Sequence, residues 1–132
     1  MKIFITGVAG FLGSHLADLM ISEGHTVAGN DNMIGGYTDN VPQNVEFHQV
    51  DCCDLENMTK AMEGCDIVYH TAATAYEGLS VFSPVLVTRN IFEASVTTIT
   101  AAIRNKVKRI VYCSSMARYG HHDEMPYKET YE

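Results

Sequence analysis

Short, continuous apolar runs alternate along the chain with longer segments in which apolar residues recur at helical spacing. Continuous runs predict strands that are buried on both faces, because a strand with one solvated face alternates apolar and polar residues. Regular alternation of strand and helix favours a parallel sheet with right-handed crossovers. The five predicted strands cover residues 2–6, 26–28, 45–50, 67–69 and 109–113.

The predicted helices are marked by apolar spacing and by end signals. Residues 11–23 carry an apolar stripe, and Gly24 stands where a helix C-cap belongs. Asp54 is placed to cap a second helix that Gly64 can end. Pro84 opens a long helix to about residue 105, which packing must stabilise because its Thr and Val content is high. The stripe of the first helix consists of Leu12, Leu16, Leu19 and Met20.

The length of 132 residues suits one domain, and no composition shift suggests a boundary inside it. Nine Lys and Arg against sixteen Asp and Glu give a formal charge of −7. So acidic a chain is a poor non-specific partner for nucleic acid or an anionic membrane. The sequence has no apolar stretch of about twenty residues and no signal peptide. We therefore expect a cytoplasmic protein whose cysteines are reduced thiols.

The strongest chemical signal is the sequence T-G-V-A-G-F-L-G at residues 6–13, directly after a strand and opening a helix. Its glycines allow a tight turn, a close approach of pyrophosphate to the backbone, and close packing of helix on strand. The phosphates would lie on free N–H groups at the positive end of the helix. The cofactor-binding candidates in this loop are Gly7, Gly10, Phe11, Leu12 and Gly13.

Asp31 follows the second strand at the spacing expected for a carboxylate that binds a ribose 2′-hydroxyl. A carboxylate there repels a 2′-phosphate, and residues 30–33 hold no Lys or Arg. The sequence therefore predicts NAD rather than NADP as the cofactor.

Other candidates carry weaker signals. Asp51 follows the third strand, where the adenine edge of a dinucleotide would lie, and His70 follows the fourth but is more simply a structural histidine. The adjacent pair His121 and His122 has no third ligand at a fixed spacing, so we predict no metal site. Ser114 ends the fifth strand without a G-x-S-x-G elbow, which gives no support to a hydrolase.

Together these motifs resemble the extended short-chain dehydrogenase/reductases, in particular the NAD-dependent epimerase/dehydratase branch. The resemblance implies a three-layer, Rossmann-like, doubly wound parallel sheet that binds NAD. It rests on the loop at 6–13, D-N at 31–32, V-D at 50–51 in place of G-D, H-T-A-A at 70–73, and S-S-M-A-R-Y-G at 114–120. It implies Ser115 as the catalytic hydroxyl. The cofactor-binding residues it implies beyond the glycine loop are Asp31, Asn32, Asp51, Cys52, Thr71, Ala72, Ala73, Asn90 and Ser114.

One departure from the family pattern concerns catalysis. The family's Y-x-x-x-K pair is expected roughly two dozen residues after Ser115, an interval that ends beyond residue 132. Tyr127 does not match the pair, because Tyr131 rather than Lys stands four residues on. We therefore expect residues 1–132 to be the NAD-binding, N-terminal portion of a longer enzyme, with later strands missing; a natural short homologue is the less favoured alternative. The chain by itself is expected to have negligible turnover, since the positioned acid/base is lacking.

Three functions remain open from the sequence. The favoured one is a nucleotide-sugar epimerase or dehydratase that transfers hydride between a sugar carbon and nicotinamide. The alternatives are a non-catalytic NAD(H)-binding regulatory module and a related reductase that acts on a non-sugar carbonyl. The resemblance also implies that the protein can form a homodimer, although the sequence does not assign the interface.

Overall fold

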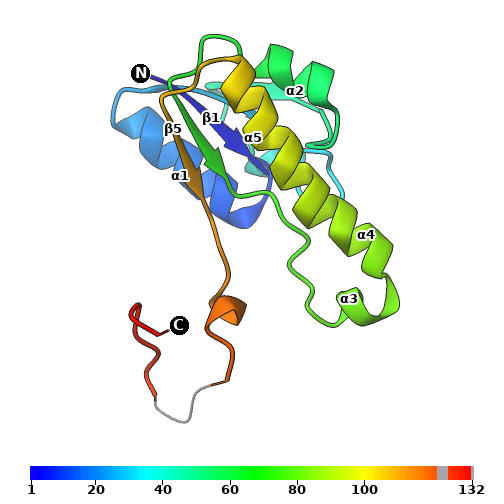
Figure 1. Cartoon of the computed structure of the whole chain (residues 1–132). Helices are drawn as coiled ribbons and strands as arrows, with labels where there is room; N and C mark the ends of the chain where they lie inside the picture. The colour runs from blue at the N-terminus through cyan, green and yellow to red at the C-terminus, as the bar shows by residue number, and fades with distance from the viewer. Residues whose placement is uncertain (122–124, 132) are drawn as a thin grey trace.

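A computed structural model describes residues 1–121 and 125–131. Its centre is a parallel sheet with the strand order β3-β2-β1-β4-β5, so the strand order reverses beside β1 (Figure 1). All five predicted strands are present, and β3 ends two residues earlier than predicted. The strands are β1 (Lys2–Thr6), β2 (Thr26–Asn30), β3 (Val45–His48), β4 (Ile67–His70) and β5 (Arg109–Tyr112).

Helices cover the two faces of the sheet and give the predicted three layers. The α-helices are α1 (Phe11–Ser22), α2 (Leu55–Ala61), α3 (Leu79–Phe82), α4 (Pro84–Thr88) and α5 (Ala94–Arg104). A π-helical segment, η2 (Arg89–Glu93), joins α4 to α5. Single 3-10 turns form η1 (Thr38–Asn40) and η3 (Met116–Tyr119).

Alternation along β1 divides the interior into two apolar clusters. Ile3 and Ile5 point to the α1 face, whereas Phe4 points to the face covered by α2 and α5. All three are essentially inaccessible to solvent. A parallel strand buried on both faces needs a continuous apolar run, which is what residues 3–5 supply.

The predicted apolar stripe of α1 is partly wrong. Leu12 and Leu19 are 54% and 51% exposed, while Gly13 and Ala17 are buried. A Cβ built on Gly13 would lie 2.2 Å from the carbonyl oxygen of Gly7, so α1 approaches β1 too closely for a large side chain at its first turn. Small residues therefore make the contact, and Leu16, Met20 and Ile21 pack only partly buried beside it.

The predicted long helix beginning at Pro84 is also interrupted. Pro84 does occupy the first turn, and Figure 1 shows α4 running on into α5 along one axis. Between them, residues 89–93 adopt the wider π geometry, which usually appears as a single turn and often at functional sites. The short helix α3 and the turn η1 were not predicted.

Candidate cofactor cleft

A cleft of about 510 Å³ lies at the carboxyl ends of the central strands. This is where an open parallel sheet binds ligands, because the chain leaves neighbouring strands in opposite directions at the point of reversal. Its volume lies in the range of small-molecule and cofactor sites. The lining comes from the loops after β1, β2, β3 and β4 and from the helix that contains Asn90 and Ala94.

The glycine loop forms the floor of the cleft. Gly7 has a φ of +68°, and a Cβ there would lie 2.9 Å from the Cα of Ala72, so only glycine fits. Ser14 is the first residue of α1 whose N–H donates to a backbone carbonyl four residues earlier, that of Gly10 at 3.0 Å. Within the described chain, the N–H groups of Phe11, Leu12 and Gly13 have no protein acceptor, and the N-cap is a glycine without a side chain. These donors form an anion-binding helix start.

Asp31 is held rigidly at the end of β2. Its Oδ2 accepts the N–H of Ala9 at 3.1 Å, and its Oδ1 accepts the N–H of Met33 at 2.8 Å. The residue is only 7% exposed, yet it lines the cleft. Each carboxylate oxygen keeps a second lone pair, so Asp31 can accept further hydrogen bonds from a ligand hydroxyl.

A buried hydrogen-bond network links β1 and β4 behind the cleft. Thr6 Oγ1 lies 2.8 Å from His70 Nδ1 and accepts the N–H groups of Thr71 and Ala72 at 3.1 and 3.0 Å. His70 Nε2 lies 3.0 Å from Ser95 Oγ. Burial lowers the pKa of His70, so the ring is neutral at neutral pH. The prediction of a satisfied structural histidine is therefore confirmed.

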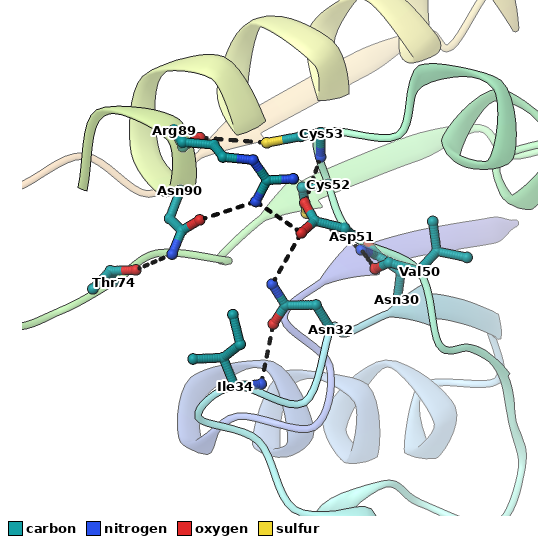
Figure 2. Close-up of polar contacts among 10 residues, drawn as sticks. All are labelled: Asn30, Asn32, Ile34, Val50, Asp51, Cys52, Cys53, Thr74, Arg89 and Asn90. Atoms are coloured by element: carbon teal, nitrogen blue, oxygen red, sulfur yellow. Dashed lines mark hydrogen bonds and ion pairs between the residues drawn. The ribbon is translucent and has the colours of Figure 1, made fainter. Parts of the chain in front are cut away.

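Asp51 lies at the outer end of the cleft in a network of polar contacts (Figure 2). Its Oδ1 accepts the N–H of Cys53 at 2.8 Å, and its Oδ2 pairs with Arg89 Nη1 at 3.0 Å and accepts from Asn32 Nδ2 at 3.5 Å. Burial acts to raise the pKa of Asp51, but these hydrogen bonds and the charge of Arg89 outweigh it and hold the pKa below its ordinary value. Asp51 is therefore an ionised, acceptor-only group at neutral pH.

Small and polar residues complete the wall after β4. Thr71 Oγ1 donates to the carbonyl oxygen of Thr6 at 2.5 Å, which fixes this segment against β1. Asn90 Nδ2 donates to Thr74 Oγ1 at 3.1 Å and so ties η2 to the same segment (Figure 2). Asn30 Oδ1 is buried at the cleft and has no partner in the described part of the chain.

The cleft brings together most of the residues that the sequence predicted. All the predicted cofactor-binding residues line it except Ser114; the candidate catalytic residue Ser115 is also outside the lining. Both serines are exposed, and Ser115 Oγ accepts the N–H of Ala117 at the start of η3, in a segment that extends away from the sheet (Figure 1). The sequence did not predict the lining residues Asn30, Ile34, Gly35, Gly36, Thr74, Ala75, Tyr76 and Ala94.

No lysine, arginine or histidine lines the cleft among the described residues, whereas two aspartates do. The described residues also contain no group of three His, Cys, Asp or Glu that could hold a metal ion. His122 lies outside the described residues.

The cysteines are unpaired thiols, and burial raises the pKa of Cys53 and of Cys65 to about 11, so both stay protonated. No described helix is long and apolar enough to cross a bilayer.

A comparison with family models matches residues 3–132 to the NAD dependent epimerase/dehydratase family. The chain belongs to this family. Among its curated relatives, a probable UDP-arabinose 4-epimerase 3 of Arabidopsis thaliana is 32% identical over 96% of this chain and 34% of the relative. A UDP-glucose 4-epimerase of Lacticaseibacillus casei is 30% identical over 98% of this chain and 40% of the relative.

Solved structures of family members share the fold. The UDP-glucose 4-epimerase of Thermus thermophilus, in complex with NAD, superposes with a TM-score of 0.93 at 33% identity, covering 99% of this chain and 43% of that one. The enzyme of Brucella ovis, also with NAD, gives 0.91 at 30% identity and covers 97% of this chain and 40% of that one. The chain thus spans about a third to two-fifths of the length of the relatives it matches.

Proposed function

We propose that this chain binds NAD in the cleft and forms the cofactor-binding part of a nucleotide-sugar epimerase or dehydratase. The observation that carries the proposal is the uncapped start of α1, which presents three free N–H groups beside the Asp31 carboxylate. Anions bind at such helix starts, and a carboxylate after the second strand accepts from ribose hydroxyls. The names of the relatives, UDP-sugar 4-epimerases, support the substrate class.

The residues present fit a dinucleotide. The N–H groups of residues 11–13 would hold the pyrophosphate, and Asp31 would hold the adenosine ribose through its remaining lone pairs. Among the residues that the structure describes, the lining carries no cation that would pair with a 2′-phosphate, which supports NAD over NADP. When bound, nicotinamide supplies a hydride acceptor or donor. The chain's own contribution is to hold the cofactor against the floor of the cleft, where the backbone is packed so closely at Gly7 and Gly13 that no Cβ fits.

We propose that residues 1–132 supply only part of the catalytic machinery. Ser115 is proposed to orient a sugar hydroxyl, which requires the segment after β5 to lie against the cleft. No tyrosine of this chain is followed by lysine four residues later. A positioned acid/base is worth about a hundred- to ten-thousand-fold in rate, so residues 1–132 alone are proposed to turn over negligibly. Interconversion of UDP-glucose and UDP-galactose by the purified chain would contradict this point.

The test of NAD binding is calorimetric titration of the chain with NAD and with NADP. Gly10→Ala is the informative variant, because its Cβ would meet only the carbonyl oxygen of Gly7, at 3.2 Å, and would occupy the approach of the phosphates. Gly78→Ala is the matched control, since Gly78 has open space around it and does not line the cleft.

We expect wild type and Gly78→Ala to bind NAD alike, and Gly10→Ala to bind at least about tenfold more weakly while unfolding at a similar temperature. Absence of NAD binding in folded wild type, or equal binding in Gly10→Ala, would reject the proposal.

A second candidate function is a non-catalytic NAD(H)-binding module. The observation that favours it is the position of the candidate catalytic residue Ser115, which lies outside the lining of the cleft. Epimerase activity in the complete gene product would reject the module, whereas NAD binding without any activity in that product would favour it.

A further inference from the structure

The carboxylate of Asp51 is almost fully occupied by the protein itself. An ionised carboxylate has about four acceptor positions. The N–H of Cys53 takes one on Oδ1, and Arg89 and Asn32 take two on Oδ2 (Figure 2). Asp51 nevertheless lines the cleft, so a single acceptor position, on Oδ1, is left for a ligand.

The position of Asp51 in the sheet shows which part of a dinucleotide would meet it. The strand order places β3 outside β2, so the loop after β3 lies beyond Asp31 on the side away from β1. If the ribose of the adenosine half lies on Asp31 and the pyrophosphate on α1, the base extends outward toward Asp51 and Cys52. This step rests on the proposed binding of NAD.

Arg89 fixes the Asp51 carboxylate from outside the cleft. It belongs to η2, and its guanidinium reaches across to the loop after β3 while the neighbouring Asn90 side chain lines the cleft. The Cys53 thiol donates to the carbonyl oxygen of Arg89 at 3.4 Å, which gives the same two segments a second contact. Arg89 itself does not line the cleft.

We infer that Arg89 is a positioning residue for base selectivity: by holding Asp51 Oδ2, it leaves one oriented acceptor that favours a base with an exocyclic amino group over a base with a carbonyl there. Adenine carries that amino donor, whereas hypoxanthine presents a carbonyl oxygen, an acceptor facing an acceptor. The ligand class is thus a 6-aminopurine dinucleotide. Without Arg89, the carboxylate is free to turn toward other donors and the preference weakens.

The test compares NAD with nicotinamide hypoxanthine dinucleotide by calorimetric titration of wild type, Arg89→Ala and Arg89→Lys. Arg104→Ala is a matched control, because Arg104 and Arg89 each make a 3.0 Å ion pair and their side chains are 45% and 44% exposed. Arg104 pairs with Glu56, and neither lines the cleft. The ratio of the two dissociation constants is informative because a general loss of structure weakens both ligands together.

We expect wild type to prefer NAD by about tenfold or more, the scale of one hydrogen bond to a charged group. Arg89→Ala should bring the ratio close to one, Arg89→Lys should restore part of it, and Arg104→Ala should leave it unchanged. If Arg89→Ala still binds NAD and the ratio of the two dissociation constants is unchanged, the role of Arg89 is overturned but the proposed NAD binding is not. Wild type that binds neither dinucleotide overturns the proposed NAD binding as well.

Discussion

Thr6 Oγ1 lies 2.8 Å from His70 Nδ1 across the β1–β4 pair, and this contact fixes the tautomer of the histidine. Because Thr6 Oγ1 already accepts two backbone N–H groups, its own proton is donated to Nδ1. His70 Nε2 then carries the ring proton and donates it to Ser95 Oγ, which in turn donates to the carbonyl oxygen of Ile91 at 2.6 Å. The neutral ring thus connects the end of β1 to η2.

Stability should depend on pH through this ring. The unfolded histidine titrates near 6.5, and burial lowers the pKa in the folded chain. Below pH 6.5 the unfolded chain therefore binds a proton that the folded chain does not, so His70 stabilises fully above that pH and progressively less as the pH falls. We expect the free energy of unfolding in urea to decrease between about pH 7 and 5, and the decrease to be smaller in His70→Gln. Equal pH slopes in the two proteins would contradict the assignment.

Close packing of α1 on the glycine loop should make Gly13 intolerant of any side chain. Gly13→Ala places a Cβ 2.2 Å from a backbone oxygen, so the helix must shift, at a cost of about 1–3 kcal/mol or more. Gly24→Ala is the contrasting variant, because φ is +81° there but space is open, which leaves only the left-handed backbone cost of about 1–2 kcal/mol. Calorimetric NAD titration should show weakened binding in Gly13→Ala only, and equal NAD affinities would argue against the tight contact.

Asp31 should contribute both to cofactor binding and to the hydrogen bonds that hold the loops around it. Asp31→Asn turns one acceptor into a donor facing a backbone N–H, either that of Ala9 or that of Met33. We expect NAD binding to weaken by about tenfold or more, with no gain in NADP binding because the cleft lining lacks a cation among the described residues. Asp39→Asn, at an exposed position outside the lining, is the control. A gain in NADP affinity would show that Asp31 alone selects the cofactor.

The sheet edge at β5 should promote self-association of this chain. β5 pairs with β4 on one side and ends the strand order, and Val111 and Tyr112 are 36% and 49% exposed. Open edges with apolar side chains pair with other strands, and a charge blocks such pairing. We expect concentration-dependent association in sedimentation experiments, reduced in Val111→Lys. A monomeric wild type at high concentration would refute this.

Much of the molecule is encoded in local sequence pattern. The apolar run at residues 2–6 predicts a buried strand, because a central parallel strand is covered by apolar layers on both faces of the sheet. β1 is such a strand. The glycine spacing at 7–13 predicts the strand–turn–helix geometry because close backbone approach excludes a Cβ, as Gly7 and Gly13 show. Asp54 was likewise predicted as a cap, and it accepts the N–H of Asn57.

Only the tertiary structure decided which distant residues meet. The pairing of Arg89 with Asp51 joins positions 38 apart, and no local pattern records it, because it depends on a π-helical turn and on the loop after β3. The buried face of α1 was mispredicted for a related reason: periodicity identifies an apolar stripe but not how near the sheet lies. Closeness to β1 selected Gly13 and Ala17 for that face and left Leu12 at the cleft.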